Sequence, residues 1–85
     1  MKTIQIEVVG TGCATCQRLH EITQRVAVEI GPEAVVSYIA NQDGMRRLLA
    51  LGLMQSPALV VNGRVAMVGF NPSTEKIKAL ILENV

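Results

Sequence analysis

The sequence of 85 residues has few aromatic side chains: one tyrosine, one phenylalanine and no tryptophan. A nucleic-acid site that stacks bases on aromatic rings is therefore not expected. The formal net charge is only +1 and no long run of basic residues occurs, so a surface that follows a phosphate backbone is not expected either. These absences argue against nucleic acid as a partner.

Long apolar segments are absent as well. The most apolar stretch, residues 48–61, is interrupted by a glycine, a glutamine, a serine and a proline, and it is too short to cross a bilayer. No secretory signal pattern follows Met1. We therefore expect a cytoplasmic protein that does not associate with a membrane and that acts as a monomer.

Cysteine occurs only twice, as Cys13 and Cys16. Two cysteines cannot supply a disulfide framework, and the apolar content of 49% is enough for one ordinary core, so we expect a single domain over residues 1–85. In a reducing compartment, such a lone pair is more often catalytic or metal-binding than structural.

The pattern of apolar residues predicts four strands and three helices. Strands are expected at 4–9, 34–40, 58–61 and 64–68, the second of them buried on both faces. The last two strands flank Asn62-Gly63, a strong hairpin signal. A first helix is expected up to Gly31, a second from a cap at Asp43 to Gly52, and a third from either Asn71-Pro72 or Ser73.

The resulting order is βαβ, then α, then ββα. A βαβ unit makes its two strands parallel, whereas a hairpin makes its strands antiparallel. The sequence therefore predicts an α/β fold with a mixed four-stranded sheet flanked by three helices.

The two cysteines fall at the start of the first predicted helix. Helical positions three apart have Cβ atoms about 5–6 Å apart, and a disulfide needs roughly 3.5–4.5 Å, so small adjustments at a helix end permit a reversible bond. Unpaired N–H groups at the helix start favour a thiolate at Cys13. Cys16 lies one turn further inside and should be more buried. Position thus assigns Cys13 as the attacking residue and Cys16 as the resolving one.

Four short motifs together resemble one family. They are GTGCATC at 10–16, SPAL at 56–59, Asn62-Gly63 and Val68-Gly69. With these motifs the chain resembles the small thioredoxin- or glutaredoxin-like proteins of bacteria and archaea known as redox-active disulfide protein 2, which have the thioredoxin fold.

The resemblance implies a thiol–disulfide oxidoreductase that transports electrons without a cofactor. It implies a cis peptide bond before Pro57 and a substrate groove bordered by Gly12, Ser56, Pro57 and Gly69. The implied partners are a disulfide-containing protein substrate and, as electron source, a thioredoxin reductase-like protein or a low-molecular-weight thiol.

The local pattern predicts the surroundings of two polar residues and three methionines. Glu7 occupies the strand where larger thioredoxins carry a buried carboxylate for proton transfer, but its alternation with apolar residues predicts a solvated side chain. His20 is expected to be a partly exposed surface residue. Met45, Met54 and Met67 are expected to fill the core.

A second interpretation of the cysteine pair is a metal site. GTGCATC before an amphipathic helix is also similar to the loop of heavy-metal-associated domains of the copper-chaperone type, in which two thiolates bind Cu(I). Cys13, Cys16 and His20 could supply three of the four ligands of a zinc site. Those domains run βαββαβ and end on a strand, whereas a terminal helix is predicted here.

Overall fold

The computed structural model describes residues 3–85, which form four strands and three helices. In chain order these are β1 (Ile4–Val9), α1 (Ala14–Ile30), β2 (Ala34–Ile39), α2 (Asn41–Ala50), β3 (Ala58–Val61), β4 (Arg64–Val68) and α3 (Thr74–Glu83). The predicted element order and the mixed four-stranded sheet with three helices are confirmed.

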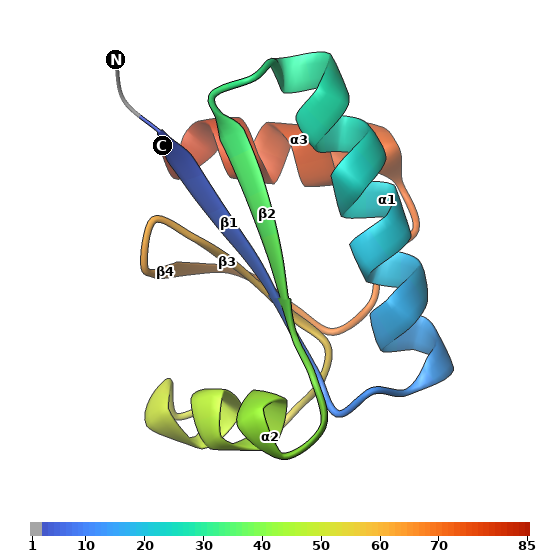
Figure 1. Ribbon diagram of the computed structural model, residues 1–85, viewed down its shortest axis with the longest axis vertical. Coiled ribbons are helices and arrows are strands. Elements are labelled where there is room, and N and C mark those ends of the chain that lie inside the picture. Colours follow the sequence, from blue (N-terminus) through green and yellow to red (C-terminus); the bar gives the residue numbers. More distant parts are fainter. Residues whose placement is uncertain (1–2) are drawn as a thin grey trace.

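The sheet has the strand order β2-β1-β3-β4. β1 pairs in parallel with β2, and α1 forms the crossover that a parallel pair requires. β1 pairs antiparallel with β3, and β3 antiparallel with β4. α1 and α3 cover one face of the sheet and α2 covers the other (Figure 1). The carboxyl end of β1 and the start of α1 therefore meet at one end of the sheet.

Two apolar clusters hold these layers together. The larger lies between the sheet and helices α1 and α3; its fully buried members include Ile6, Leu19, Val26, Leu59, Ile77 and Ile81. The smaller lies under α2 and contains Val9, Leu48, Ala58 and Val60. Because each large apolar side chain contributes about 1.5–3 kcal/mol on full burial, both clusters fix the helices on the sheet.

The prediction that the strand at 34–40 is buried on both faces is wrong. β2 is an edge strand, and its side chains alternate between half-buried and exposed. Val36 and Tyr38 pack toward α1, whereas Val35 and Ser37 are exposed on the other face. The short helix α2 does not reach that part of the sheet, so these side chains stay exposed. The apolar run predicts a strand covered on both faces, but it cannot show which helices cover it.

Two helix starts also differ from the expected ones. α2 begins at Asn41 and its cap is Ala40, so Asp43 lies in the first turn instead of capping the helix. α3 has Ser73 as its cap, with the Ser73 Oγ accepting a hydrogen bond from the Lys76 amide at 3.2 Å. The alternative start at Asn71-Pro72 is therefore excluded. The Asn71 side chain instead accepts a hydrogen bond from the Ser73 amide at 2.9 Å.

The predicted hairpin is present. Asn62 and Gly63 both have positive φ values, 51° and 82°, and they connect Val61 to its partner Arg64. Two residues with positive φ suit the right-handed twist of the flanking strands. This turn sets the register of β4 against the central strand β3.

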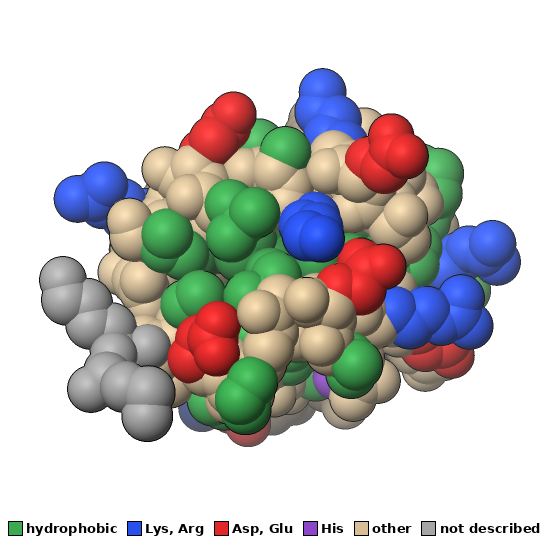
Figure 2. Space-filling model, turned by 90° about the horizontal axis from the view of Figure 1, so that it is seen from above, with side chains coloured by type: hydrophobic (Ala, Val, Ile, Leu, Met, Phe, Trp, Pro, Cys, Tyr) green, Lys and Arg blue, Asp and Glu red, His purple; other side chains and the backbone are tan. Residues whose placement is uncertain are grey.

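Charged side chains of both signs are interspersed over the surface seen in Figure 2. This distribution agrees with the net charge of +1. None of the helices in residues 3–85 is long and apolar enough to cross a bilayer.

Candidate active site

Cys13 and Cys16 lie at the start of α1, where the chain leaves β1. Cys13 is the cap residue of the helix, with an extended backbone (φ −74°, ψ 168°), and Cys16 lies in its first turn. Cys13 is exposed and Cys16 is completely buried, and both are free thiols. The structure thus presents one sulfur to a partner molecule and keeps the other inside.

The burial of Cys16 depends on Gly10 at the end of β1. A Cβ atom at Gly10 would stand 2.5 Å from the Cys16 Sγ and 2.8 Å from its Cβ. No side chain other than hydrogen leaves room for this contact. Gly10 thus allows Cys16 to pack directly on the end of the strand, a role that the sequence analysis did not assign.

Gly44 in α2 makes a second close approach to the same loop. A Cβ atom at Gly44 would overlap the carbonyl oxygen of Gly10 and would stand 2.8 Å from that of Ile39. The backbone of α2 therefore rests directly on the residue that supports Cys16. In the sequence, a glycine inside an amphipathic helical pattern is the signal that could have indicated this contact.

Gly12, directly before Cys13, must also be glycine. Its φ of 87° lies in the left-handed region, and a Cβ atom there would overlap the Oδ1 of Asn41. Asn41 is the first residue of α2 and itself has a positive φ of 57°. The loop before Cys13 is thus held between the end of β1 and the start of α2.

The environment of Cys13 favours its thiolate. The pKa of the Cys13 thiol is lowered to about 7, first by the Cys16 side chain and then by the Thr15 hydroxyl, with smaller effects from the Cys16 amide and Thr11. The Thr15 Oγ1 lies 3.2 Å from the Cys13 Sγ. Hydrogen bonds to a charged group favour its charged form. Cys13 is therefore a substantial fraction thiolate near neutral pH.

Pro57 lies beside the cysteine pair. The bond between Ser56 and Pro57 is cis, and Pro57 is buried. Its Cβ would be 3.8 Å from a Cβ atom at Gly10, and its carbonyl oxygen accepts a hydrogen bond from the Gly69 amide at 2.8 Å. The structure therefore places Ser56, Pro57 and Gly69 together at the end of the sheet that carries the cysteines.

We call Ser56, Pro57 and Gly69 the rim of the site. An apolar pocket of about 310 Å³ adjoins this rim at Ser56. Thr11 and Ser56 form its polar edge, and the remaining lining residues are Met45, Leu48, Leu49, Leu53, Met54 and Gln55. Met54 is fully exposed and Leu49 is 71% exposed. The prediction that the methionines fill the core is thus wrong for Met45 and Met54; only Met67 packs against the core.

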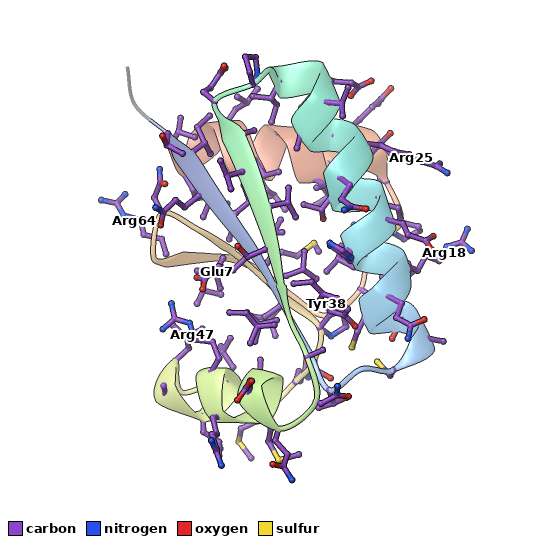
Figure 3. All side chains as sticks on the ribbon, in the orientation of Figure 1. Glu7, Arg18, Arg25, Tyr38, Arg47 and Arg64 are labelled. Carbon is purple, nitrogen blue, oxygen red and sulfur yellow. The ribbon has the colours of Figure 1, made fainter. Side chains whose placement is uncertain are left out.

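Glu7 faces away from the cysteines. Its carboxylate lies 3.1 Å from the Arg47 guanidinium of α2, on the face of the sheet opposite α1 (Figure 3). Its side chain is 24% exposed, so the prediction of a solvated Glu7 is wrong. The reason is that α2 brings Arg47 over this part of β1, a contact between residues far apart in the sequence.

His20 and Tyr38 form an aromatic pair on the α1 side of the sheet. Their ring centroids are 4.6 Å apart and their planes are inclined by 19°. His20 is half-buried, in agreement with the prediction that it is partly exposed. Its aromatic partner could not be identified from the local pattern.

The metal-binding interpretation conflicts with the fold. α2 separates β2 from β3, and the last element is a helix, whereas the copper-chaperone type places two strands after its first helix and ends on a strand. Within residues 3–85, no three His, Cys, Asp or Glu side chains are grouped closely enough to hold a metal ion.

Comparisons with known proteins bear on both fold and chemistry. A family model described as thioredoxin domain matches residues 4–82. A thioredoxin of Methanothermobacter thermautotrophicus is 33% identical over 78 residues, which cover 92% of this chain and 97% of that protein. A mutant thioredoxin from Halobacterium salinarum has a TM-score of 0.72 at 20% identity, over 98% of this chain and 75% of that one. The structure of a malarial protein gives a TM-score of 0.71 at 11% identity, over 99% of each chain.

Proposed function

The chain belongs to the thioredoxin family and is a disulfide oxidoreductase, and from this premise we propose that Cys13 attacks a disulfide of a protein substrate and that Cys16 resolves the mixed disulfide. The observation that carries the proposal is the difference between the two sulfurs. Cys13 is exposed and its thiol pKa is lowered to about 7, whereas Cys16 is fully buried. Only the exposed thiolate can reach an incoming disulfide.

The reaction balances without a cofactor. The Cys13 thiolate forms a bond with one substrate sulfur and releases the other as a thiolate. The Cys16 thiol then loses its proton and attacks the Cys13 sulfur. This second step forms the Cys13–Cys16 disulfide and releases the second substrate sulfur, which takes up a proton. The substrate is reduced by two electrons and the cysteine pair is oxidised.

The rim beside the cysteines supports a docking role for Gly12, Ser56, Pro57 and Gly69. Ser56 lies two residues before Ala58, the first residue of β3, so its backbone lies outside the strand ladder and can pair with an extended substrate segment. Gly12 directly precedes Cys13, so its backbone borders the exposed sulfur on the other side.

The apolar pocket next to the rim supports a preference among substrates. Met45, Leu49 and Met54 present flexible or bulky apolar groups beside Thr11 and Ser56. Methionine adapts to ligands of different shape. We therefore expect substrates that carry an apolar side chain close to the reacting cysteine.

The oxidised pair must be reduced again for turnover. We assign this step to a thioredoxin reductase-like protein or to a low-molecular-weight thiol, and we place the cycle in a reducing compartment such as the cytoplasm. Both cysteines come from one chain, so a monomer suffices for the chemistry.

Alkylation of the reduced protein tests the assignment of the cysteines. The rate of modification at Cys13 should rise with pH around a midpoint of about 7, because only the thiolate reacts. Cys16 should stay protected in the folded protein. Mass spectrometry of digested samples identifies the modified residue, and a redox titration against glutathione shows whether the pair cycles. Faster labelling of Cys16, or a pair that does not form a disulfide, would contradict the proposal.

A further inference from the structure

Asn41, the first residue of α2, has a backbone conformation that its position in a helix does not require. Its φ is 57°, in the left-handed region, whereas residues of a right-handed helix have negative φ. Within residues 3–85, the other residue besides glycine with a positive φ is Asn62. The hairpin turn accounts for Asn62, and its Oδ1 accepts a hydrogen bond from the Gln5 amide at 2.9 Å. Asn41 begins a helix instead, so its strained conformation needs another explanation.

The side chain of Asn41 lies against the loop that carries the nucleophile. Its Oδ1 occupies the space that a side chain on Gly12 would fill, and Gly12 directly precedes Cys13, whose sulfur is exposed. Figure 1 shows the turn from β2 into α2 beside the loop between β1 and α1. The Gly10 amide donates a hydrogen bond to the Ile39 carbonyl oxygen at 2.9 Å, which fixes these two segments to each other. The carboxamide is therefore held next to the attacking cysteine.

This carboxamide is available to another molecule. Asn41 is exposed, and its side chain takes part in none of the side-chain hydrogen bonds found within residues 3–85. A carboxamide has an oxygen that accepts hydrogen bonds and an NH2 group that donates two. It therefore matches the C=O and N–H groups of a peptide backbone.

Asn41 also lies between the apolar pocket and Cys13. Met45 comes one helical turn after Asn41 and lines the pocket, and Thr11 lines it from the nucleophile loop. Thr11 is separated from Cys13 only by Gly12, and Asn41 lies against that intervening glycine. A substrate that places an apolar side chain in the pocket and its sulfur at Cys13 therefore passes the carboxamide.

We propose that the Asn41 carboxamide binds the main chain of the substrate segment beside the cysteine that Cys13 attacks. The inference rests on the proposed function and names its substrate class, a disulfide within an extended peptide segment. Asn41 forms no bond to sulfur and transfers no proton, so the exchange of disulfide bonds described above is unchanged. Its contribution is confined to substrates that have a peptide backbone, and a small disulfide without one gains nothing from it.

Two variants and two substrates test this role. Asn41→Gly removes the carboxamide and keeps the left-handed conformation, which glycine adopts without strain. Its kcat/KM for a peptide disulfide should fall about fivefold, the expected effect of losing one neutral hydrogen bond. Its reduction of an aromatic disulfide that contains no peptide groups should keep the wild-type rate. Gln42→Ala removes an exposed carboxamide from the next residue and should resemble the wild type with both substrates.

The same measurements separate substrate binding from support of the loop. Slower reduction of both disulfides by Asn41→Gly, or a midpoint of Cys13 alkylation shifted away from about 7, would show a structural role and overturn the inference. So would an Asn41→Gly protein in which the two kcat/KM values keep their wild-type ratio. If the wild-type protein reduced neither disulfide, the proposed function itself would fail.

Discussion

At the scale of single residues, Thr15 offers a direct control over the reactivity of Cys13. Its side chain is exposed, and its hydroxyl lies 3.2 Å from the Cys13 sulfur. Thr15→Val keeps the branched shape and removes the hydroxyl, so the pKa of Cys13 should rise. Alkylation of Cys13 at about pH 6 should then slow about two- to fivefold, since an exposed hydrogen bond to a thiolate contributes roughly 0.5–1 kcal/mol.

Thr11→Val is the matched control for that experiment. Thr11 also lowers the pKa of Cys13, but its effect is the smallest of those that do. The control should therefore slow alkylation less than Thr15→Val does. An unchanged rate in Thr15→Val would show that its hydroxyl does not stabilise the thiolate, and a larger effect at Thr11 would show that Thr11 is the more important of the two hydroxyls.

Some residue roles were accessible from the sequence, and others depended on the fold. The exposure of Cys13 and the burial of Cys16 follow from their places at a helix start, which is a local property. The contact of Cys16 with Gly10 and the ion pair of Glu7 with Arg47 join different elements. Alternation along β1 shows which face Glu7 occupies, but it cannot show what covers that face.

At the scale of elements, the packing of α2 against the cysteine loop should control the stability of the reduced protein. Gly44→Ala introduces a methyl group where the carbonyl oxygen of Gly10 lies. Because the overlap is with a backbone atom, we place the cost of overpacking in the upper part of its usual range, at about 2–3 kcal/mol, and the better helix propensity of alanine returns about 1 kcal/mol. The free energy of unfolding in urea should therefore fall by about 1–2 kcal/mol, and alkylation of Cys16 should become faster as the loop shifts.

Gln42→Ala provides the comparison within the same helix. Gln42 is exposed, so its replacement should change the free energy of unfolding by no more than about 0.5 kcal/mol. Equal stability of Gly44→Ala and Gln42→Ala would mean that α2 can move away from Gly10 without cost. The close backbone contact would then have no part in supporting Cys16.

The elements themselves were largely predictable because their signals are local. Alternation in β1, the stripe of Leu19, Ile22 and Val26 in α1, and the Asn62-Gly63 turn each identified an element that the structure contains. Strand order is not a local property. The edge position of β2 results from pairing with β1 alone, and this is why its apolar run suggested more burial than it has.

At the scale of the whole molecule, charge and apolar surface contribute unequally to the recognition of a partner. The net charge is +1, and both signs are interspersed on the face shown in Figure 2. Such a surface produces little long-range steering. The pocket bordered by Thr11 and Ser56, in contrast, gathers exposed apolar side chains from α2 and from the segment before Pro57. Recognition of substrates should thus depend on apolar contact more than on charge.

Leu49→Gln tests whether apolar contact governs the recognition of substrates, and Val28→Gln is its control. Both residues are exposed apolar positions in helices, at 71% and 81%, but only Leu49 lines the pocket. Loss of roughly 1 kcal/mol of apolar contact should reduce kcat/KM for a disulfide-bonded protein such as insulin about fivefold. Reduction of a small disulfide should be unaffected, because it does not reach the pocket, and Val28→Gln should resemble the wild type with both substrates. The wild-type rate should change by less than about twofold between low and high salt. A strong salt dependence together with normal activity of Leu49→Gln would instead assign recognition to charged side chains around the rim.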